Sequence, residues 1–124
     1  MNPVKDETIP LERMADLCRD LLVKSRQLVS DEDFTKETDT AKIIAFDFVQ
    51  MSETFNRLSP EIKKKFRTVN EATIKGMRNV LVHDYGRIEG IIVRRTLEKD
   101  IDPLLQETLQ LVEELRKANK KADF

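Results

Sequence analysis

Residues 10–30 read PLERMADLCRDLLVKSRQLVS, and this stretch decides the fold class. Its apolar residues recur every three or four positions, which is the spacing of one face of an amphipathic helix. That spacing predicts a helix over about 10–30, with Pro10 in its first turn. The only cysteine, Cys18, lies inside the apolar face, so we expect a buried, unreactive thiol. The residues of this face are Leu11, Met14, Leu17, Cys18, Leu21, Leu22, Ser25, Leu28 and Val29.

A second helix is predicted from about 36–39 to Leu58, and its apolar set is broad. A helix that is apolar on more than one face is usually covered on more than one side. In a chain of 124 residues, the second apolar face of this helix can be buried against another subunit. The set is Ala41, Ile43, Ile44, Ala45, Phe46, Phe48, Val49, Met51 and Phe55.

A third, short helix is predicted to begin after Ser59. Serine is a good N-cap, and Pro60 fits the first helical position. Glu61 suits the positive end of the helix dipole. We expect this helix to end near Phe66 or Arg67.

Two more helices are predicted, over about 69–83 and about 88–119. Pro103 should kink or split the last one near Asp100, because proline lacks the amide hydrogen and its ring clashes with the preceding turn.

The whole chain therefore predicts an all-α fold, an up-and-down bundle of four or five helices in one domain over 1–124. The ends, 1–8 and 118–124, are expected to fray. With 3 glycines and 4 prolines, the chain has too few turn residues for most sandwiches or barrels. No membrane-spanning run and no export signal are present, so a cytoplasmic location is expected.

Charge is distributed unevenly, although the net charge is only −1. Residues 1–62 carry a net −5, residues 63–95 a net +6, and residues 96–124 a net −2. A basic block inside an acidic chain creates a local field that attracts phosphate. The alternative is an ordinary solvated lysine face.

Candidate catalytic and phosphate-binding residues are concentrated in the run of residues 76–86, GMRNVLVHDYG. Helical geometry places Asn79 and His83, which are four residues apart, on one face. Arg78 is long enough to reach the same side at the end of the helix. An arginine, an amide and the only imidazole of the chain, together with Tyr85, make a candidate phosphate site.

A structural interpretation of the same run stays open. His83 can be favoured by the negative end of a helix, and Arg78 can pair with Asp84. Tyr85 can simply cover the end of the bundle. Asp84 has no assigned catalytic role. One histidine and one cysteine give no metal-ligand spacing, and no glycine-rich phosphate loop is present, so neither a metal nor a cofactor is expected.

The pattern Arg78–x4–His83–x–Tyr85, with Asn79 after the arginine, resembles the signature of the HEPN superfamily. More narrowly, it is similar to the HepT-like branch, the toxin partners of minimal nucleotidyltransferases.

The resemblance covers about residues 9–116. Residues 58–61, LSPE, are similar to the branch's connection between its second and third helices, and residues 100–105, DIDPLL, to its last helix. The chain departs from the pattern at residues 51–54, MSET, where the branch often carries Gly-Glu-Ala, and in having no tryptophan.

This resemblance implies a metal-independent endoribonuclease that acts as a homodimer with a composite cleft. It implies that Arg78 and His83 are catalytic. From their own chemistry, Asn79 can orient the imidazole or bind the RNA phosphate, and Tyr85 can stack on a base or hold the RNA phosphate. The resemblance also implies a cognate minimal nucleotidyltransferase antitoxin that silences the enzyme by AMPylation of Tyr85.

The residues themselves are also compatible with two other functions. The chain can be a non-catalytic, nucleotide- or substrate-binding partner of a nucleotidyltransferase, or a plain dimerisation bundle. An intact arginine and histidine favour the enzyme, because nucleotide binding alone needs no acid–base residue.

Overall fold

The structure is a computed structural model that describes residues 6–27, 39–70, 72, 74 and 90–122. Within these ranges every regular element is an α-helix and no strand occurs. The all-α prediction is therefore confirmed for this part of the chain, while the number of helices in the bundle and the homodimer stay predictions.

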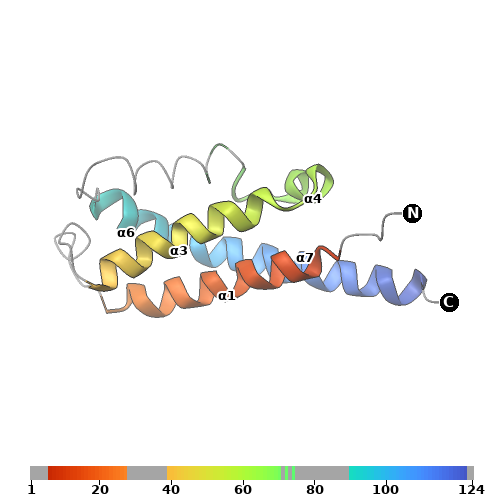
Figure 1. The fold of residues 1–124 in the computed structure, drawn as a ribbon, viewed down its shortest axis with the longest axis horizontal. Helices are drawn as coiled ribbons and strands as arrows, with labels where there is room; N and C mark the ends of the chain where they lie inside the picture. The colour runs from red at the N-terminus through yellow and green to blue at the C-terminus, as the bar shows by residue number, and fades with distance from the viewer. Residues whose placement is uncertain (1–5, 28–38, 71, 73, 75–89, 123–124) are drawn as a thin grey trace.

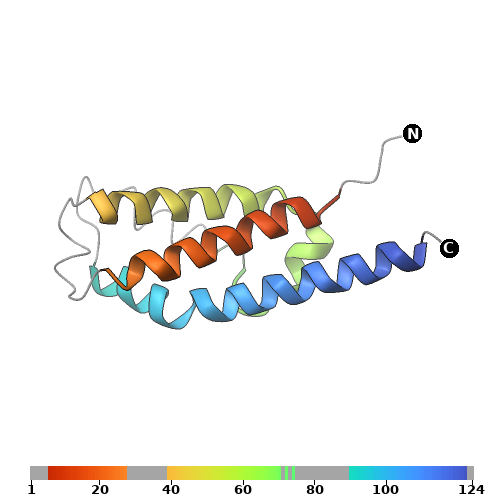
Figure 2. The same cartoon turned by 90° about the horizontal axis from the view of Figure 1, so that it is seen from below.

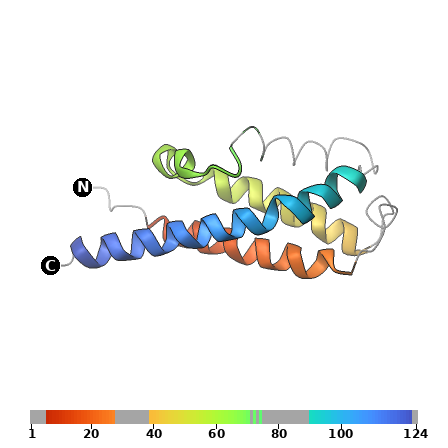
Figure 3. The same ribbon diagram turned by 180° about the vertical axis from the view of Figure 1, so that it is seen from behind.

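The described helices are α1 (Thr8–Ser25), α3 (Asp39–Asn56), α4 (Pro60–Lys65), α6 (Gly90–Lys99) and α7 (Ile101–Ala122). Helix α1 lies between α3 and the α6–α7 pair and runs antiparallel to both (Figure 2). The short α4 lies near the end of the bundle where α1 begins (Figure 1). Figure 3 shows α6 and α7 following each other along the long axis.

Helix α1 buries the predicted face, with Leu11, Met14, Leu17, Cys18 and Leu21 all buried. It ends at Ser25, which is earlier than predicted. The hydroxyl of Ser25 donates to the Leu22 carbonyl at 2.8 Å, and the amide of Arg26 bonds to a carbonyl three residues back. Such bonds tighten the last turn and satisfy its carbonyls, which ends the helix. Residues 28–30 of the predicted helix lie outside the described residues.

Helix α3 ends at Asn56, close to the predicted end, and its apolar residues divide between two sides. Ile44, Phe48, Met51 and Phe55 form a buried stripe at helical spacing. Ile43 and Phe46 face outward, with 43% and 61% of their surface exposed. The breadth of the apolar pattern therefore reflects one buried face and one exposed face within this chain.

Helix α4 begins as predicted, because the Ser59 hydroxyl accepts a hydrogen bond from the Ile62 amide at 3.3 Å. Its last turn carries three lysines, which suit the negative end of the helix dipole. The backbone is extended again at Phe66, one of the two predicted ends. Of the predicted helix over 69–83, Ala72 and Ile74 are described as helical, and most of the rest lies outside the described residues.

The predicted break near Asp100 is confirmed, because α6 ends at Lys99 and α7 begins at Ile101. Pro103 has no amide hydrogen to give to Lys99, four residues earlier, so the helix is interrupted there. The amide of Asp100 still bonds to the Thr96 carbonyl at 2.9 Å, which keeps the two helices nearly continuous. At the other end, α7 is helical to Ala122.

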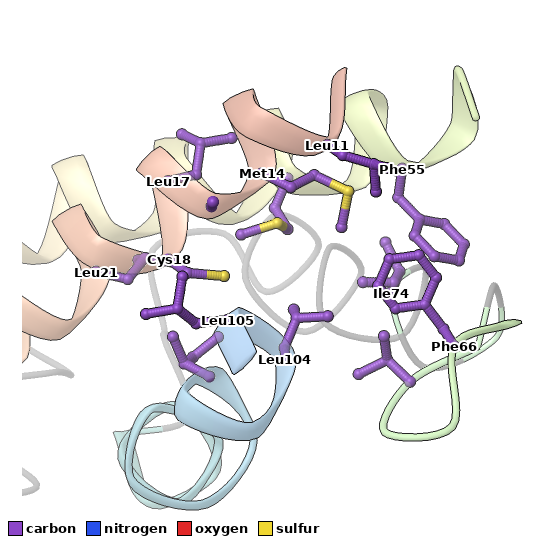
Figure 4. Close-up of a cluster of buried hydrophobic side chains, with 14 of the residues drawn as sticks. Leu11, Met14, Leu17, Cys18, Leu21, Phe55, Phe66, Ile74, Leu104 and Leu105 are labelled. Carbon is purple, nitrogen blue, oxygen red and sulfur yellow. The ribbon is translucent and has the colours of Figure 1, made fainter. Parts of the chain in front are cut away.

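One hydrophobic core joins the described helices, and Figure 4 shows part of it. Leucine side chains from α1 and α7 meet along its length, around the Cys18 thiol. At one end the rings of Phe55 and Phe66 meet edge to face, with centroids 5.4 Å apart. Among the described residues, no helix is both long enough and apolar enough to cross a membrane.

Candidate functional site

The predicted site residues Arg78, Asn79, His83 and Tyr85, together with Asp84, lie outside the described residues. The structure therefore does not test their geometry, and their roles stay predictions. It does describe the chain on both sides of this run, from α4 to Ile74 and from α6 onward. These two flanks determine where the run is attached to the bundle.

The upstream flank is fixed first at Ser59, the N-cap of α4. The carboxylate of Glu7, just before α1, accepts hydrogen bonds from the Ser59 backbone amide and from its hydroxyl, the latter at 2.8 Å. Hydrogen bonds to a carboxylate are stronger than those between neutral groups. Glu7 therefore ties the start of α4 to the start of α1, across 52 residues of sequence.

The same flank is fixed again just after α4 by Glu107 of α7. Its carboxylate accepts hydrogen bonds from the backbone amides of Arg67, at 3.0 Å, and Thr68, at 3.2 Å. It also accepts one from the Thr68 hydroxyl at 2.8 Å. One side chain thus holds two successive residues at the turn that leads toward the predicted run.

Packing completes this attachment, because Ile74 is buried at 2% exposure in the core beside Phe66 (Figure 4). Its amide bonds to the Asn70 carbonyl at 3.0 Å, which is a helical bond. Arg78 follows four residues later, so its Cα lies within about 14 Å of the Ile74 Cα even if the chain between them is fully extended. The chain is therefore anchored in the core four residues before the predicted site begins.

The downstream flank is α6, which packs against α1 and α7. Thr96 and Leu97 are buried, and the Thr96 carbonyl accepts a hydrogen bond from the Asp100 amide. Both ends of the predicted run thus join helices that share one core.

A second group of ionisable residues joins α1 to α3. The ammonium of Lys24 lies between the carboxylates of Asp20 and Asp47, and its nitrogen is 3.2 Å from an Asp47 oxygen. Asp47 is buried, and this burial raises its pKa, with Asp20 adding to the effect and Lys24 opposing it. The hydrogen bond from Lys24 lowers the pKa of Asp20, and the same bond raises the pKa of Lys24.

The thiol of Cys18 is buried, as predicted, and burial raises its pKa to about 12. A thiol with this pKa holds its proton at neutral pH, so it is a poor nucleophile. Over the described ranges, His, Cys, Asp and Glu side chains do not gather into a group of three or more that could hold a metal ion.

Sequence reasoning missed Glu7, Glu107 and Asp47. Each is one acidic residue among many on predicted helices or at their ends, and its partner lies 23 to 52 residues away. Only Asp47 carries a local signal, since it stands between the apolar residues Phe46 and Phe48.

Comparison with known proteins connects this chain to one family. The sequence model of the family described as "Ribonuclease HepT-like" matches residues 11–111, which include both flanks and the run between them. A protein of Caldanaerobacter subterraneus subsp. tengcongensis named "Putative RNase" is 25% identical over 103 residues, covering 83% of this chain and 91% of that protein. No solved structure gives a significant match. The chain belongs to the HepT-like ribonuclease family.

Proposed function

We propose that this protein is a metal-independent endoribonuclease, the toxin of a pair with a minimal nucleotidyltransferase, and that Arg78 and His83 cleave the RNA. The observation that carries the proposal is the family match over residues 11–111, because the matched region contains the Arg-x4-His-x-Tyr pattern. The relative named as an RNase supports the same reaction class.

The chemistry follows from the residue types. The 2′-hydroxyl oxygen of RNA attacks the adjacent phosphorus, the bond from phosphorus to the 5′-oxygen breaks, and a 2′,3′-cyclic phosphate and a 5′-hydroxyl result. One group must take the proton of the 2′-hydroxyl, and another must give a proton to the leaving oxygen. Histidine titrates near pH 6.5 and can do either, while arginine holds the charge that develops on the phosphate.

A homodimer would supply both proton-transfer groups, because each chain has a single histidine. Two copies whose predicted runs face each other would bring two imidazoles and two guanidinium groups to one composite cleft. The outward-facing Ile43 and Phe46 of α3 support this association, since exposed apolar residues close together on one helix favour a protein interface. Asn79 and Tyr85 are proposed to hold the RNA phosphate beside the catalytic pair.

Regulation by AMPylation is part of the proposal. Tyr85 is the only tyrosine of the chain and stands two residues after His83. An AMP group there would add a phosphate next to Arg78, where it would occupy the place of the RNA phosphate and repel the RNA backbone.

The test is RNA cleavage by the purified protein, with the ends of the products identified. We expect 5′-hydroxyl and 2′,3′-cyclic phosphate ends, and undiminished cleavage in excess EDTA. Loss of activity in EDTA that added magnesium restores would contradict the metal-independent reaction. Tight RNA or nucleotide binding with no cleavage would favour the alternative, a binding subunit of a nucleotidyltransferase.

A further inference from the structure

Two cavities border α4, and lysines of this helix line both. The first, of about 400 Å³, lies between the end of α4 and α7. Lys64, Lys65 and Arg67 line it from the α4 side, and Glu107, Gln110, Leu111 and Glu114 line it from α7. Volumes of roughly 300–1,000 Å³ are typical of sites for small ligands or parts of larger ones.

The three cations of this first cavity are open to an anion. Lys64, Lys65 and Arg67 are exposed, and within the described part of the chain their side chains form no ion pair. Glu107 lines the same cavity, but its carboxylate is already bonded to the backbone amides of Arg67 and Thr68. The carboxylate therefore stabilises the turn and leaves the side-chain cations available for phosphate.

The second cavity, of about 440 Å³, has a different lining and shares Lys64 with the first. Pro60, Phe66 and Ala72 give it apolar walls, of which Phe66 keeps only 7% of its surface exposed, and Lys63 and Lys64 add positive charge. Apolar surfaces accept the faces of unstacked nucleobases, while a neighbouring lysine holds the phosphate backbone. A nucleobase held here would place its phosphate near Lys64.

We propose that α4 and its two cavities form a contact surface for single-stranded RNA, made of residues that precede the Arg78–His83 pair in the sequence. The inference rests on the proposed function, since the RNA is the proposed substrate. Ala72 precedes Arg78 by six residues, so the two Cα atoms lie within about 21 Å of each other. One short strand of RNA can therefore reach both places.

The test compares two double variants that remove the same charge. Lys64→Gln/Lys65→Gln removes two cations of the proposed surface, and Lys42→Gln/Lys99→Gln removes two exposed lysines that line neither cavity, one near the start of α3 and one at the end of α6. Binding of a short fluorescein-labelled single-stranded RNA is measured by anisotropy over a range of salt concentrations. The His83→Ala protein serves as the background, so that the RNA stays intact.

For Lys64→Gln/Lys65→Gln we expect Kd to rise roughly tenfold and the slope of log K against log salt to become shallower by about 1.4, which is two single-strand phosphate contacts. The control double variant should keep the Kd and slope of the background. Glu114→Gln should act in the opposite direction and tighten binding, because it removes a negative charge from the same cavity. With His83 present, the double variant should raise KM and leave kcat unchanged.

Equal Kd and equal slope for the two double variants would overturn the proposal, while the wild type could still cleave RNA and so keep the proposed function. Equal binding of duplex and single-stranded RNA would overturn the assignment to single strands. If Lys64→Gln/Lys65→Gln leaves the RNA affinity unchanged and weakens binding of the partner nucleotidyltransferase, the surface binds that protein, and the RNA proposal is overturned. A wild type that neither binds nor cleaves RNA would instead be a failure of the proposed function.

Discussion

Glu107 accepts hydrogen bonds from both the backbone amide and the hydroxyl of Thr68, at 3.2 and 2.8 Å, across 39 residues of sequence. Thr68 stands at the turn between α4 and the helical residues Ala72 and Ile74. One carboxylate on the longest described helix thus fixes the chain that leads into the predicted catalytic run. We therefore expect Glu107 to be a positioning residue in the proposed enzyme.

Replacing Glu107 should therefore affect both stability and cleavage. Glu107→Ala removes the acceptor for the Arg67 amide, the Thr68 amide and the Thr68 hydroxyl, and we expect the free energy of unfolding to fall by about 1 kcal/mol, since water can reach the exposed amides. RNA cleavage should fall as well, at a temperature where the variant is folded. Glu107→Gln keeps one acceptor oxygen and should recover part of both losses. Urea unfolding and initial cleavage rates measure the two effects.

Gln106→Ala is the matched control for Glu107, because Gln106 is the preceding residue on α7 and is exposed. It should change neither stability nor cleavage appreciably. If Gln106→Ala and Glu107→Ala behave alike, the positioning role of Glu107 is wrong.

Removing Lys24 should make stability depend more steeply on pH. Burial raises the folded-state pKa of Asp47, so its charged form opposes folding once the pH exceeds the ordinary aspartate value, and Lys24 offsets that effect. We expect Lys24→Met to lower the free energy of unfolding by about 1–3 kcal/mol at neutral pH. The loss should shrink as the pH falls through the folded-state pKa of Asp47, which burial holds above the ordinary aspartate value, because the protonated side chain no longer needs the lysine. Thermal unfolding measured across this pH range checks the sign.

The double variant Lys24→Met/Asp47→Asn removes the buried charge together with its partner. It should regain most of the stability lost in Lys24→Met at neutral pH, and it should flatten the pH dependence. A double variant as unstable as Lys24→Met would show that the effect is lost packing of the lysine chain.

His83→Ala should lower RNA cleavage by roughly 10²–10⁴, the usual contribution of a general acid or base. Arg78→Ala should lower it to a similar extent, because the charge that develops on the phosphate loses its partner. Circular dichroism should show the wild-type helix content in both variants. Cleavage by His83→Ala at the wild-type rate would rule out the imidazole as a proton-transfer group.

Phe46→Ser should weaken the proposed homodimer, because Phe46, which is 61% exposed in the single chain, would be buried between two copies. We expect the dimer dissociation constant to rise by roughly tenfold or more in sedimentation equilibrium, for a loss of about 1.4 kcal/mol or more. Ile9→Ser, at a similarly exposed apolar residue of α1, is the control and should leave association unchanged. A wild type that is monomeric at micromolar concentration would count against the dimer.

Tyr85→Phe should escape AMPylation and keep the fold, since the ring is retained and the hydroxyl is lost. Co-expression of the wild type with its nucleotidyltransferase should add the mass of one or more AMP groups, all on Tyr85. Intact-mass spectra and peptide mapping check this. An adduct on a serine or threonine would contradict the assignment, and so would an absent adduct with an active partner and ATP.

The sequence by itself determined the local features of the described fold. Apolar spacing predicted the buried face of α1, Ser59 and Pro60 predicted the start of α4, and Pro103 predicted the break between α6 and α7. These features depend on helical period, capping and proline geometry, which act over a few neighbouring residues. The candidate pair Arg78 and His83 came from the same kind of local spacing, together with a family resemblance that the comparisons confirm.

Only the tertiary structure decided which distant groups meet. The bonds from Ser59 to Glu7 and from Thr68 to Glu107, and the ion pair of Lys24 with Asp47, join residues 23 to 52 positions apart. It also decided that Phe46 faces outward while Phe48 is buried, although both are phenylalanines of one helix. The reason is physical: an acidic side chain has many cations and amides within reach of a flexible chain, and packing of the helices selects one of them.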